Sequence, residues 1–170
     1  MDILNKELLK DKCYINGQWI NSDSRDKIEI NNPATLNIIG SVPKCGTNET
    51  KLAIESANNA LPSWKIKTAK ERSLLLKKWY DLIILNQEDL AKIMTIEQGK
   101  PINESRGEIG YGASFIELYA EEGKRIYGET IPDTLPDRRI LIIKQPIGVV
   151  AAITPWNFPS SMITRKAGPA

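Results

Sequence analysis

The sequence predicts a mixed α/β fold, and three observations support this prediction. Segments with helix-capping residues and an apolar repeat of three to four positions fill the middle of the chain. The run 147–153 is apolar at every position, which is typical of a strand buried on both faces. Asn16 and Gly17 lie between two short apolar arms, the strongest local signal for a hairpin.

A small antiparallel β layer is expected before the helices. The first hairpin covers about 13–20, and further strands are expected at 27–30 and 36–42. Asparagine and proline at 31–33 supply the turn residues between these two strands.

Four helices are expected next, each with its own start signal or stop signal. They are placed at about 48–64, 68–85, 87–98 and 101–123. Asn48 or Thr47 caps the first helix, and Thr68 with Glu71 forms a capping box that opens the second. Asn86 is expected to cap the third helix.

Gly99 and Pro101 end the third helix, because glycine accepts the left-handed conformation and proline cannot continue the helix. The apolar faces expected for the first two helices are Ile54, Ala57, Leu61 and Trp64, and Leu75, Trp79, Leu82 and Ile83. The fourth helix has an unusually small face, which allows close packing against another helix or a sheet. That face consists of Ile109, Gly112, Ala113, Ile116 and Ala120.

The region after the helices reads as an edge hairpin. Residues 128–136 are rich in turn formers, and 138–144 has an alternating to apolar pattern typical of a strand. An edge hairpin of a single domain is one interpretation that these residues allow.

A proline-bounded string, Ile153-Thr154-Pro155-Trp156-Asn157-Phe158-Pro159, follows the apolar run directly. Prolines cannot lie inside a strand, so the strand should end at about Thr154. Asn157 is then presented at the carboxyl end of a central strand, where open α/β sheets place their ligands. Its amide NH2 can donate to developing negative charge. The alternative is a proline-rich loop in which Asn157 only stabilises the turn.

This string resembles the oxyanion-hole motif of the aldehyde dehydrogenase superfamily. The flanking segments 146–149 and 162–170 look like its succinate-semialdehyde dehydrogenase branch, and the similarity extends over essentially the whole chain. The resemblance implies the N-terminal part of the aldehyde dehydrogenase fold, with a partial Rossmann-like cofactor domain. In that fold 1–127 begins the NAD(P)-binding domain, 128–146 is a β arm for oligomerisation, and 147–170 returns to the cofactor domain, truncated after the motif.

The resemblance also implies roles for individual residues. Asn157 is an oxyanion donor, and Lys166 belongs to a proton path or is a surface lysine. Arg165 binds the substrate carboxylate, or else it faces solvent on an amphipathic helix. Phe158 and Met162 line a substrate tunnel or are ordinary core residues. The nicotinamide half of the cofactor rests on Ile153, Thr154, Pro155 and Trp156.

A second string, at 97–101, also resembles the family. In some relatives an acid at the position of Glu97 helps to hold a structural monovalent cation, and otherwise no metal is expected. Helix capping by Gly99 explains this string without any function.

The implied activity is NAD- or NADP-dependent oxidation of a small aldehyde, succinate semialdehyde, to succinate in 4-aminobutyrate catabolism. The complete enzyme is expected to be a homodimer or homotetramer. Neither Cys13 nor Cys45 has the family's catalytic context, so we expect the nucleophile to lie outside this chain and the chain alone to be inactive. The alternatives are an interaction or oligomerisation module without catalysis, and a dehydrogenase of broader specificity.

Composition excludes several function classes. A net charge of +2 without a Lys/Arg cluster argues against a nucleic-acid partner, and the absence of histidine removes Ser-His and Cys-His catalysis. Prolines within the uncharged stretch 145–164 argue against a membrane span. Residues 1–12 lack the apolar stretch of a signal peptide, so a cytoplasmic location is expected, with Cys13 and Cys45 as free thiols.

Overall fold

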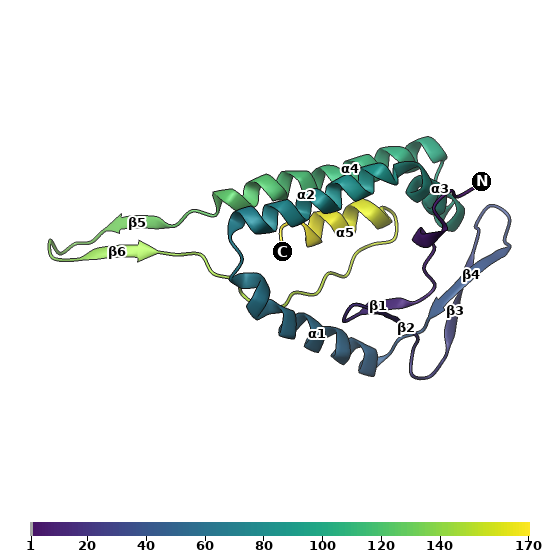
Figure 1. Ribbon diagram of the computed structural model, residues 1–170, viewed down its shortest axis with the longest axis horizontal. Helices are drawn as coiled ribbons and strands as arrows, with labels where there is room; N and C mark the ends of the chain where they lie inside the picture. The colour runs from purple at the N-terminus through teal and green to yellow at the C-terminus, as the bar shows by residue number, and fades with distance from the viewer. Residues whose placement is uncertain (1) are drawn as a thin grey trace.

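The computed structural model describes residues 2–170, in which helices pack together and three two-stranded sheets lie around them (Figure 1). The helices are α1 (Thr47–Lys65), α2 (Ala69–Leu85), α3 (Gln87–Gln98), α4 (Ile102–Glu122) and α5 (Pro159–Ala167). The strands are β1 (Cys13–Ile15), β2 (Gln18–Ile20), β3 (Lys27–Asn31), β4 (Ile38–Pro43), β5 (Glu129–Pro132) and β6 (Arg139–Ile142). Short 3-10 helices occur at η1 (Lys6–Leu8) and η2 (Gly123–Arg125). The four helices predicted from start and stop signals are all present, each within one residue of its expected ends.

The predicted N-terminal hairpin is confirmed. β1 pairs antiparallel with β2, and its turn residues Asn16 and Gly17 both have positive φ, of 51° and 76°. Tyr14 lies opposite Trp19, with ring centroids 5.1 Å apart. β3 and β4 form the second antiparallel pair, as expected from their turn residues.

The hydrophobic core lies between α2, α3 and α4. Its buried members are Ile83, Ala91, Met94, Ile109, Ala113 and Ile116. Larger, partly buried side chains close it from the sides: Leu76, Trp79, Tyr80, Leu90 and Ile102. Each large aliphatic side chain that is fully buried contributes about 1.5–3 kcal/mol to folding.

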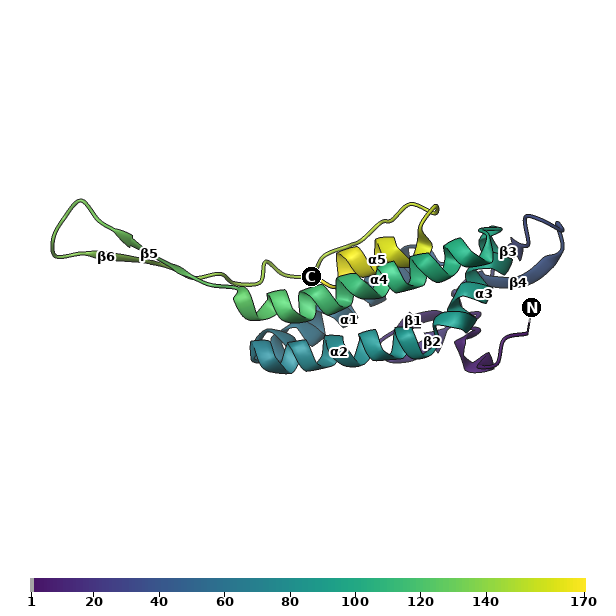
Figure 2. The same ribbon diagram turned by 90° about the horizontal axis from the view of Figure 1, so that it is seen from above.

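α5 lies against the small face of α4 (Figure 2), as the small residues of that face predict. A Cβ added at Gly112 would lie 3.2 Å from Thr164 Oγ1 and 3.3 Å from the Cα of Ser161. The absence of a side chain at Gly112 therefore lets the two helices approach closely.

The capping residues predicted for α2 are correct, whereas those predicted for α1 are not. The capping box of α2 is confirmed, with the Glu71 amide donating to Thr68 Oγ1 and the Thr68 amide donating to Glu71 Oε2. α1 starts after Gly46, and the expected caps at Thr47 or Asn48 are wrong. The Gly46 amide donates to Glu49 Oε2 at 2.7 Å, so an acid inside the first turn does the capping.

The expected apolar faces of α1 and α2 are only partly right. α1 packs mainly against β1 and leaves Ile54 54% exposed, because no described element covers that side. α2 buries Ile83 but leaves Leu75 and Leu82 exposed, since its contact face is rotated toward Leu76.

The strand predicted at 147–153 is not formed, and this prediction is wrong. Residues 143–158, here called the return segment, run without regular structure from β6 back along α5 to its N-terminus (Figure 1). Ile147 and Ile153 are 93% and 99% exposed. A strand needs a neighbour to satisfy its backbone hydrogen bonds, and no strand of the described residues pairs with this segment.

β5 and β6 form a hairpin within the predicted region 128–146. It projects away from the helices at one end of the molecule (Figures 1 and 2), and every residue of its two strands is exposed. Within residues 2–170, no helix is both long enough and apolar enough to cross a membrane.

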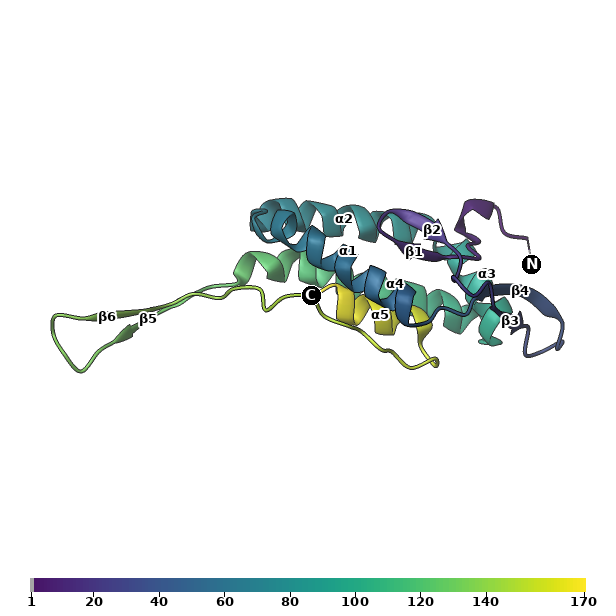
Figure 3. The same ribbon diagram turned by 90° about the horizontal axis from the view of Figure 1, so that it is seen from below.

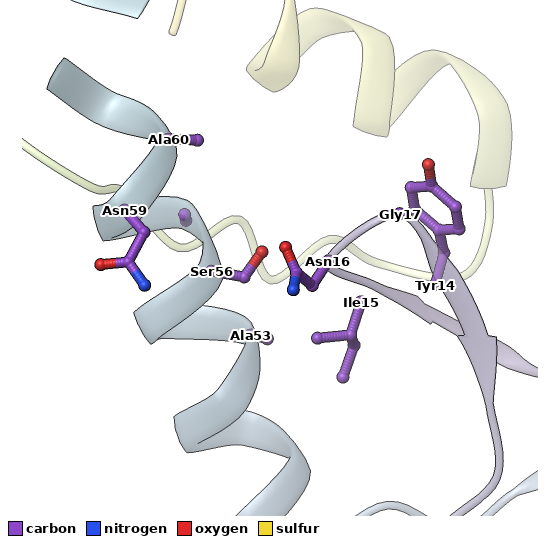
Figure 4. A pocket seen from close by; sticks show the side chains of 9 residues that line it. Tyr14, Ile15, Asn16, Gly17, Ala53, Ser56, Asn59 and Ala60 are labelled. Atoms are coloured by element: carbon purple, nitrogen blue, oxygen red, sulfur yellow. The ribbon is translucent and has the colours of Figure 1, made fainter. Parts of the chain in front are cut away.

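The β1–β2 hairpin lies beside α1 (Figure 3). Between the hairpin turn and the helix is an open pocket of about 530 Å³. Asn16 from the turn and Ser56 from α1 point toward each other across it (Figure 4).

Candidate functional site

The candidate site is the turn that ends the return segment, together with the start of α5. Trp156 and Asn157 form the turn, Phe158 is the N-cap, and Pro159 occupies the first helical position. Proline suits that position because its missing N–H would have no partner there and its φ is already helical. Pro159 thus fixes where the loop ends and the helix begins.

The turn is held through its backbone rather than its side chains. The Gln98 amide donates to the carbonyl oxygens of Trp156 and Asn157, at 3.0 and 3.1 Å. The Lys100 ammonium also donates to the Asn157 carbonyl, at 2.9 Å, and lies 4.1 Å from the centre of the Phe158 ring. The α3–α4 connection therefore clamps the loop from one side.

Glu108 joins this clamp to α5. Its carboxylate forms an ion pair with Lys100, and their side chains are only 2% and 10% exposed. The other carboxylate oxygen accepts the backbone N–H groups of Ser160 and Ser161, at 2.9 and 3.2 Å. These are unpaired amides of the first turn of α5, where a negative charge is also favoured by the helix dipole. One carboxylate thus balances the Lys100 charge and caps α5.

Asn157 is exposed, and no hydrogen bond within residues 2–170 involves its side-chain amide. Its backbone is fixed while its NH2 group is available to a ligand. Donors that are positioned in advance stabilise an oxyanion most effectively, because no reorganisation is needed as charge develops. The geometry is compatible with the predicted oxyanion role of Asn157, which stays a prediction.

Arg165 lies on the face of α5 that contacts α4. Its guanidinium donates to the Tyr111 hydroxyl at 2.9 Å and lies 4.7 Å from the centre of the Phe115 ring. Its Nε is buried without a hydrogen-bond partner, and no carboxylate of the described residues pairs with it. The aromatic contacts orient a positive charge that has no counter-ion in this part of the chain.

The other predicted site residues lie around the same turn. Met162 is partly buried one helical turn from Phe158, whereas Lys166 is exposed and its side chain has no hydrogen bond among the described residues. The residues predicted to support the nicotinamide lie along the end of the return segment: Ile153, Thr154, Pro155 and Trp156. Ile153 and Trp156 are 99% and 80% exposed, so they offer uncovered apolar surface to a planar ring.

Glu97 is the last predicted site residue. Desolvation raises the pKa of its carboxyl. Within residues 2–170, no cluster of three or more Cys, Asp or Glu side chains could hold a metal ion. The cation role of Glu97 stays a prediction.

The sequence reasoning missed the residues that hold the turn: Gln98, Lys100 and Glu108. The string at 97–101 was explained by capping, and Gly99 does end α3 with φ of 78°. Glu108 could have been identified from the sequence, because it lies four positions before Gly112 on the buried face of α4. A carboxylate within an apolar helical stripe needs a partner, and this indicates a buried ion pair.

The chain is similar to known proteins in both sequence and fold. The profile of the aldehyde dehydrogenase family matches residues 19–170. The chain is 59% identical over its full length to glutarate-semialdehyde dehydrogenase of Pseudomonas putida, and 55% identical to succinate-semialdehyde dehydrogenase [NADP(+)] of Escherichia coli. It spans 35% of the length of each of these relatives.

A solved structure of succinate-semialdehyde dehydrogenase from Burkholderia pseudomallei superposes with a TM-score of 0.98 at 52% identity. The superposition covers all of this chain and 35% of that one. The fold class predicted from the sequence is thereby confirmed for this segment.

Proposed function

The chain belongs to the aldehyde dehydrogenase family, and on that premise we propose that the protein containing it oxidises a short aldehyde that carries a terminal carboxylate. Succinate semialdehyde is the substrate that we favour, and glutarate semialdehyde is the next longer homologue. NAD or NADP accepts the hydride. The proposal extends to the whole protein, of which this chain supplies one part of the site.

The observation that carries this proposal is Arg165. Its guanidinium is stacked on Phe115, hydrogen-bonded to Tyr111, and has no acidic partner in the described chain. A planar guanidinium that is oriented but not neutralised suits a carboxylate, which it can bind through two parallel hydrogen bonds. The two relatives named above are both named for aldehydes of this class.

In the proposed mechanism the residues of this chain bind, orient and stabilise. Arg165 holds the far carboxylate, while Phe158 and Met162 contact the methylene chain between it and the aldehyde. A cysteine thiolate that this chain does not supply attacks the aldehyde carbon, and the carbonyl oxygen becomes anionic. The Asn157 amide donates to that oxygen, and Gln98 and Lys100 hold the Asn157 backbone in place. Residues 153–156 would hold the nicotinamide end of the cofactor, which would supply the hydride acceptor.

The test uses a chimera in which this chain replaces the matching segment of the P. putida relative. Asn157→Ala should lower kcat by about 10²–10³, the usual effect of losing one oxyanion donor. Its far-UV circular dichroism should not change, because the loop is held through backbone groups. A kcat within threefold of the parent, on the order of 0.7 kcal/mol or less in barrier, would remove Asn157 from this role.

Substrate class is tested with Arg165→Ala in the same chimera. The kcat/KM should fall for succinate and glutarate semialdehydes and stay nearly constant for butanal and pentanal. Arg165→Lys is the matched control, since it keeps the charge but loses the planar fork, and it should fall between the two. An equal loss for charged and uncharged aldehydes would show that Arg165 is structural.

A second function is favoured by the β5–β6 hairpin. It projects from the molecule and exposes Ile131, Ile140, Leu141 and Ile142. We infer that this hairpin is a contact surface between subunits. Leu141→Glu should lower the mass of the assembled chimera in analytical ultracentrifugation, and an unchanged mass would contradict the inference.

A further inference from the structure

Cys13 and Cys45 are brought together by the fold although they lie 32 positions apart. Cys13 is the first residue of β1, and Cys45 lies in the connection between β4 and α1. Their Sγ atoms are 3.4 Å apart, and both thiols are free. A disulfide bond needs the sulfur atoms about 2 Å apart, so the two sulfur atoms must come about 1.4 Å closer to form it.

We propose that Cys13 and Cys45 form a dithiol that closes to an intramolecular disulfide when a disulfide oxidant such as oxidised glutathione is present. The closed form locks the β1–β2 hairpin to the N-terminus of α1. This pair is separate from the proposed aldehyde site and takes no part in its chemistry.

The reaction is a two-step thiol–disulfide exchange. The Cys13 thiolate attacks oxidised glutathione, forms a mixed disulfide and releases one glutathione thiolate. The Cys45 thiolate then attacks the Cys13 sulfur and releases the second glutathione. The two protons lost by the protein thiols go to the two glutathione thiolates. One oxidised glutathione is reduced to two thiols as the protein pair is oxidised.

The surroundings of Cys45 give the reaction a pH dependence. Desolvation and the hydrogen bond with Cys13 raise the pKa of Cys45 to about 11. The negative charges of Glu49 and Asp23 act in the same direction. Cys45 is therefore protonated near neutral pH, and ring closure should speed up as the pH rises toward that value.

The location of the pair decides what closure does. α1 packs mainly against β1 and leaves most of its apolar side chains exposed. Few packing contacts therefore hold α1 to the rest of the chain. A covalent link at Cys45, just before the N-cap of α1, would add a fixed attachment there. The link would also fix the two walls of the pocket between the hairpin turn and α1 (Figure 4).

The experiment incubates the full chain with oxidised glutathione at mildly alkaline pH and maps its peptides without reduction. We expect one linked peptide pair that contains Cys13 and Cys45, no titratable thiol, and a monomer on a non-reducing gel. The oxidised chain should melt about 5–10 °C above the reduced chain, because a loop of this length loses entropy when it is closed in the unfolded state.

Cys13→Ser and Cys45→Ser are the matched controls. Each should carry a stable glutathione adduct on its remaining cysteine and show no rise in Tm. Two adducts on the parent chain, a disulfide between two chains, or a linked pair without a rise in Tm would each overturn the proposal.

Discussion

α4 and the return segment both carry many apolar side chains, yet only α4 buries most of them. Ile116 of α4 is fully buried, whereas Ile153 of the return segment is 99% exposed. α4 has α2, α3 and α5 as neighbours, and the return segment has no strand beside it within residues 2–170. An apolar sequence alone therefore does not determine burial, because burial also depends on which elements lie beside the segment.

The largest effect is expected where the two regions are joined. Glu108→Ala would leave the buried Lys100 ammonium without its counter-ion and two amides of α5 without their acceptor. We expect a loss of about 3–5 kcal/mol in the free energy of unfolding, measured by urea denaturation with circular dichroism.

Glu88→Ala is the matched control, because Glu88 pairs with Arg106 while both side chains remain about half exposed. That variant should lose less than about 1 kcal/mol. Equal losses for the two variants would mean that burial of the Glu108 pair does not matter.

A smaller effect is expected at the contact between α4 and α5. Gly112→Ala places a methyl group 3.2 Å from Thr164 Oγ1, whereas Gly107→Ala in the same helix meets no atom within 4 Å. Both variants gain helix propensity, so their difference isolates the contact. Gly112→Ala should be less stable than Gly107→Ala by about 1–3 kcal/mol, as measured by urea denaturation. Two equally stable variants would contradict close packing here.

A pH-dependent effect is expected where the N-terminal segment meets α3. The backbone amides of Asn5 and Leu4 donate to the Asp89 carboxylate and lower its pKa from the usual 3.8. A lowered pKa means that this contact stabilises the fold above about pH 4. It is lost as the pH falls through the still lower value of the folded chain.

Hydrogen exchange of the Leu4 and Asn5 amides, followed by NMR from neutral to acidic pH, would measure this loss. The amides should lose protection in acid, relative to the pH dependence of the intrinsic exchange rate. In Asp89→Asn, protection should be low at every pH. Protection of the parent amides that does not fall at any acidic pH would contradict the role of Asp89.

The smallest effect on stability is expected in the return segment itself. Ile153→Lys should change the free energy of unfolding by less than about 0.5 kcal/mol, because that side chain is already exposed. It should reduce self-association of the chain in sedimentation velocity, since an uncovered apolar segment favours aggregation. Ile116→Lys, in the core, should abolish cooperative unfolding. A large loss of stability from Ile153→Lys would show that the segment is packed after all.

Local signals made most of the fold predictable. Thr68 with Glu71, Gly99, and the Asn16-Gly17 turn each specify a backbone conformation through nearby atoms, and each was predicted correctly. The strand at 147–153 was not, because a strand depends on partners that its own residues do not describe. The contact face of α2 was missed for a related reason, since its rotation is set by α4.

The residues of the candidate site also fall into two groups, those that the sequence identified and those that only the structure shows. Asn157 and Arg165 were identifiable because their motif resembles a known family. Gln98, Lys100 and Glu108 act on the motif from about 50–60 positions away, through backbone atoms that no sequence motif displays. Only the folded chain brings them to the turn.

The way in which the turn at Asn157 is held has a consequence for redesign of the side chain at that position. Gln98 and Lys100 bind the carbonyl oxygen of residue 157, a group that every amino acid possesses. The side chain at 157 can therefore be exchanged while the loop keeps its path. Position 157 can therefore carry histidine, glutamine or an unnatural hydrogen-bond donor. Each substitution would change the group that donates to a bound oxygen.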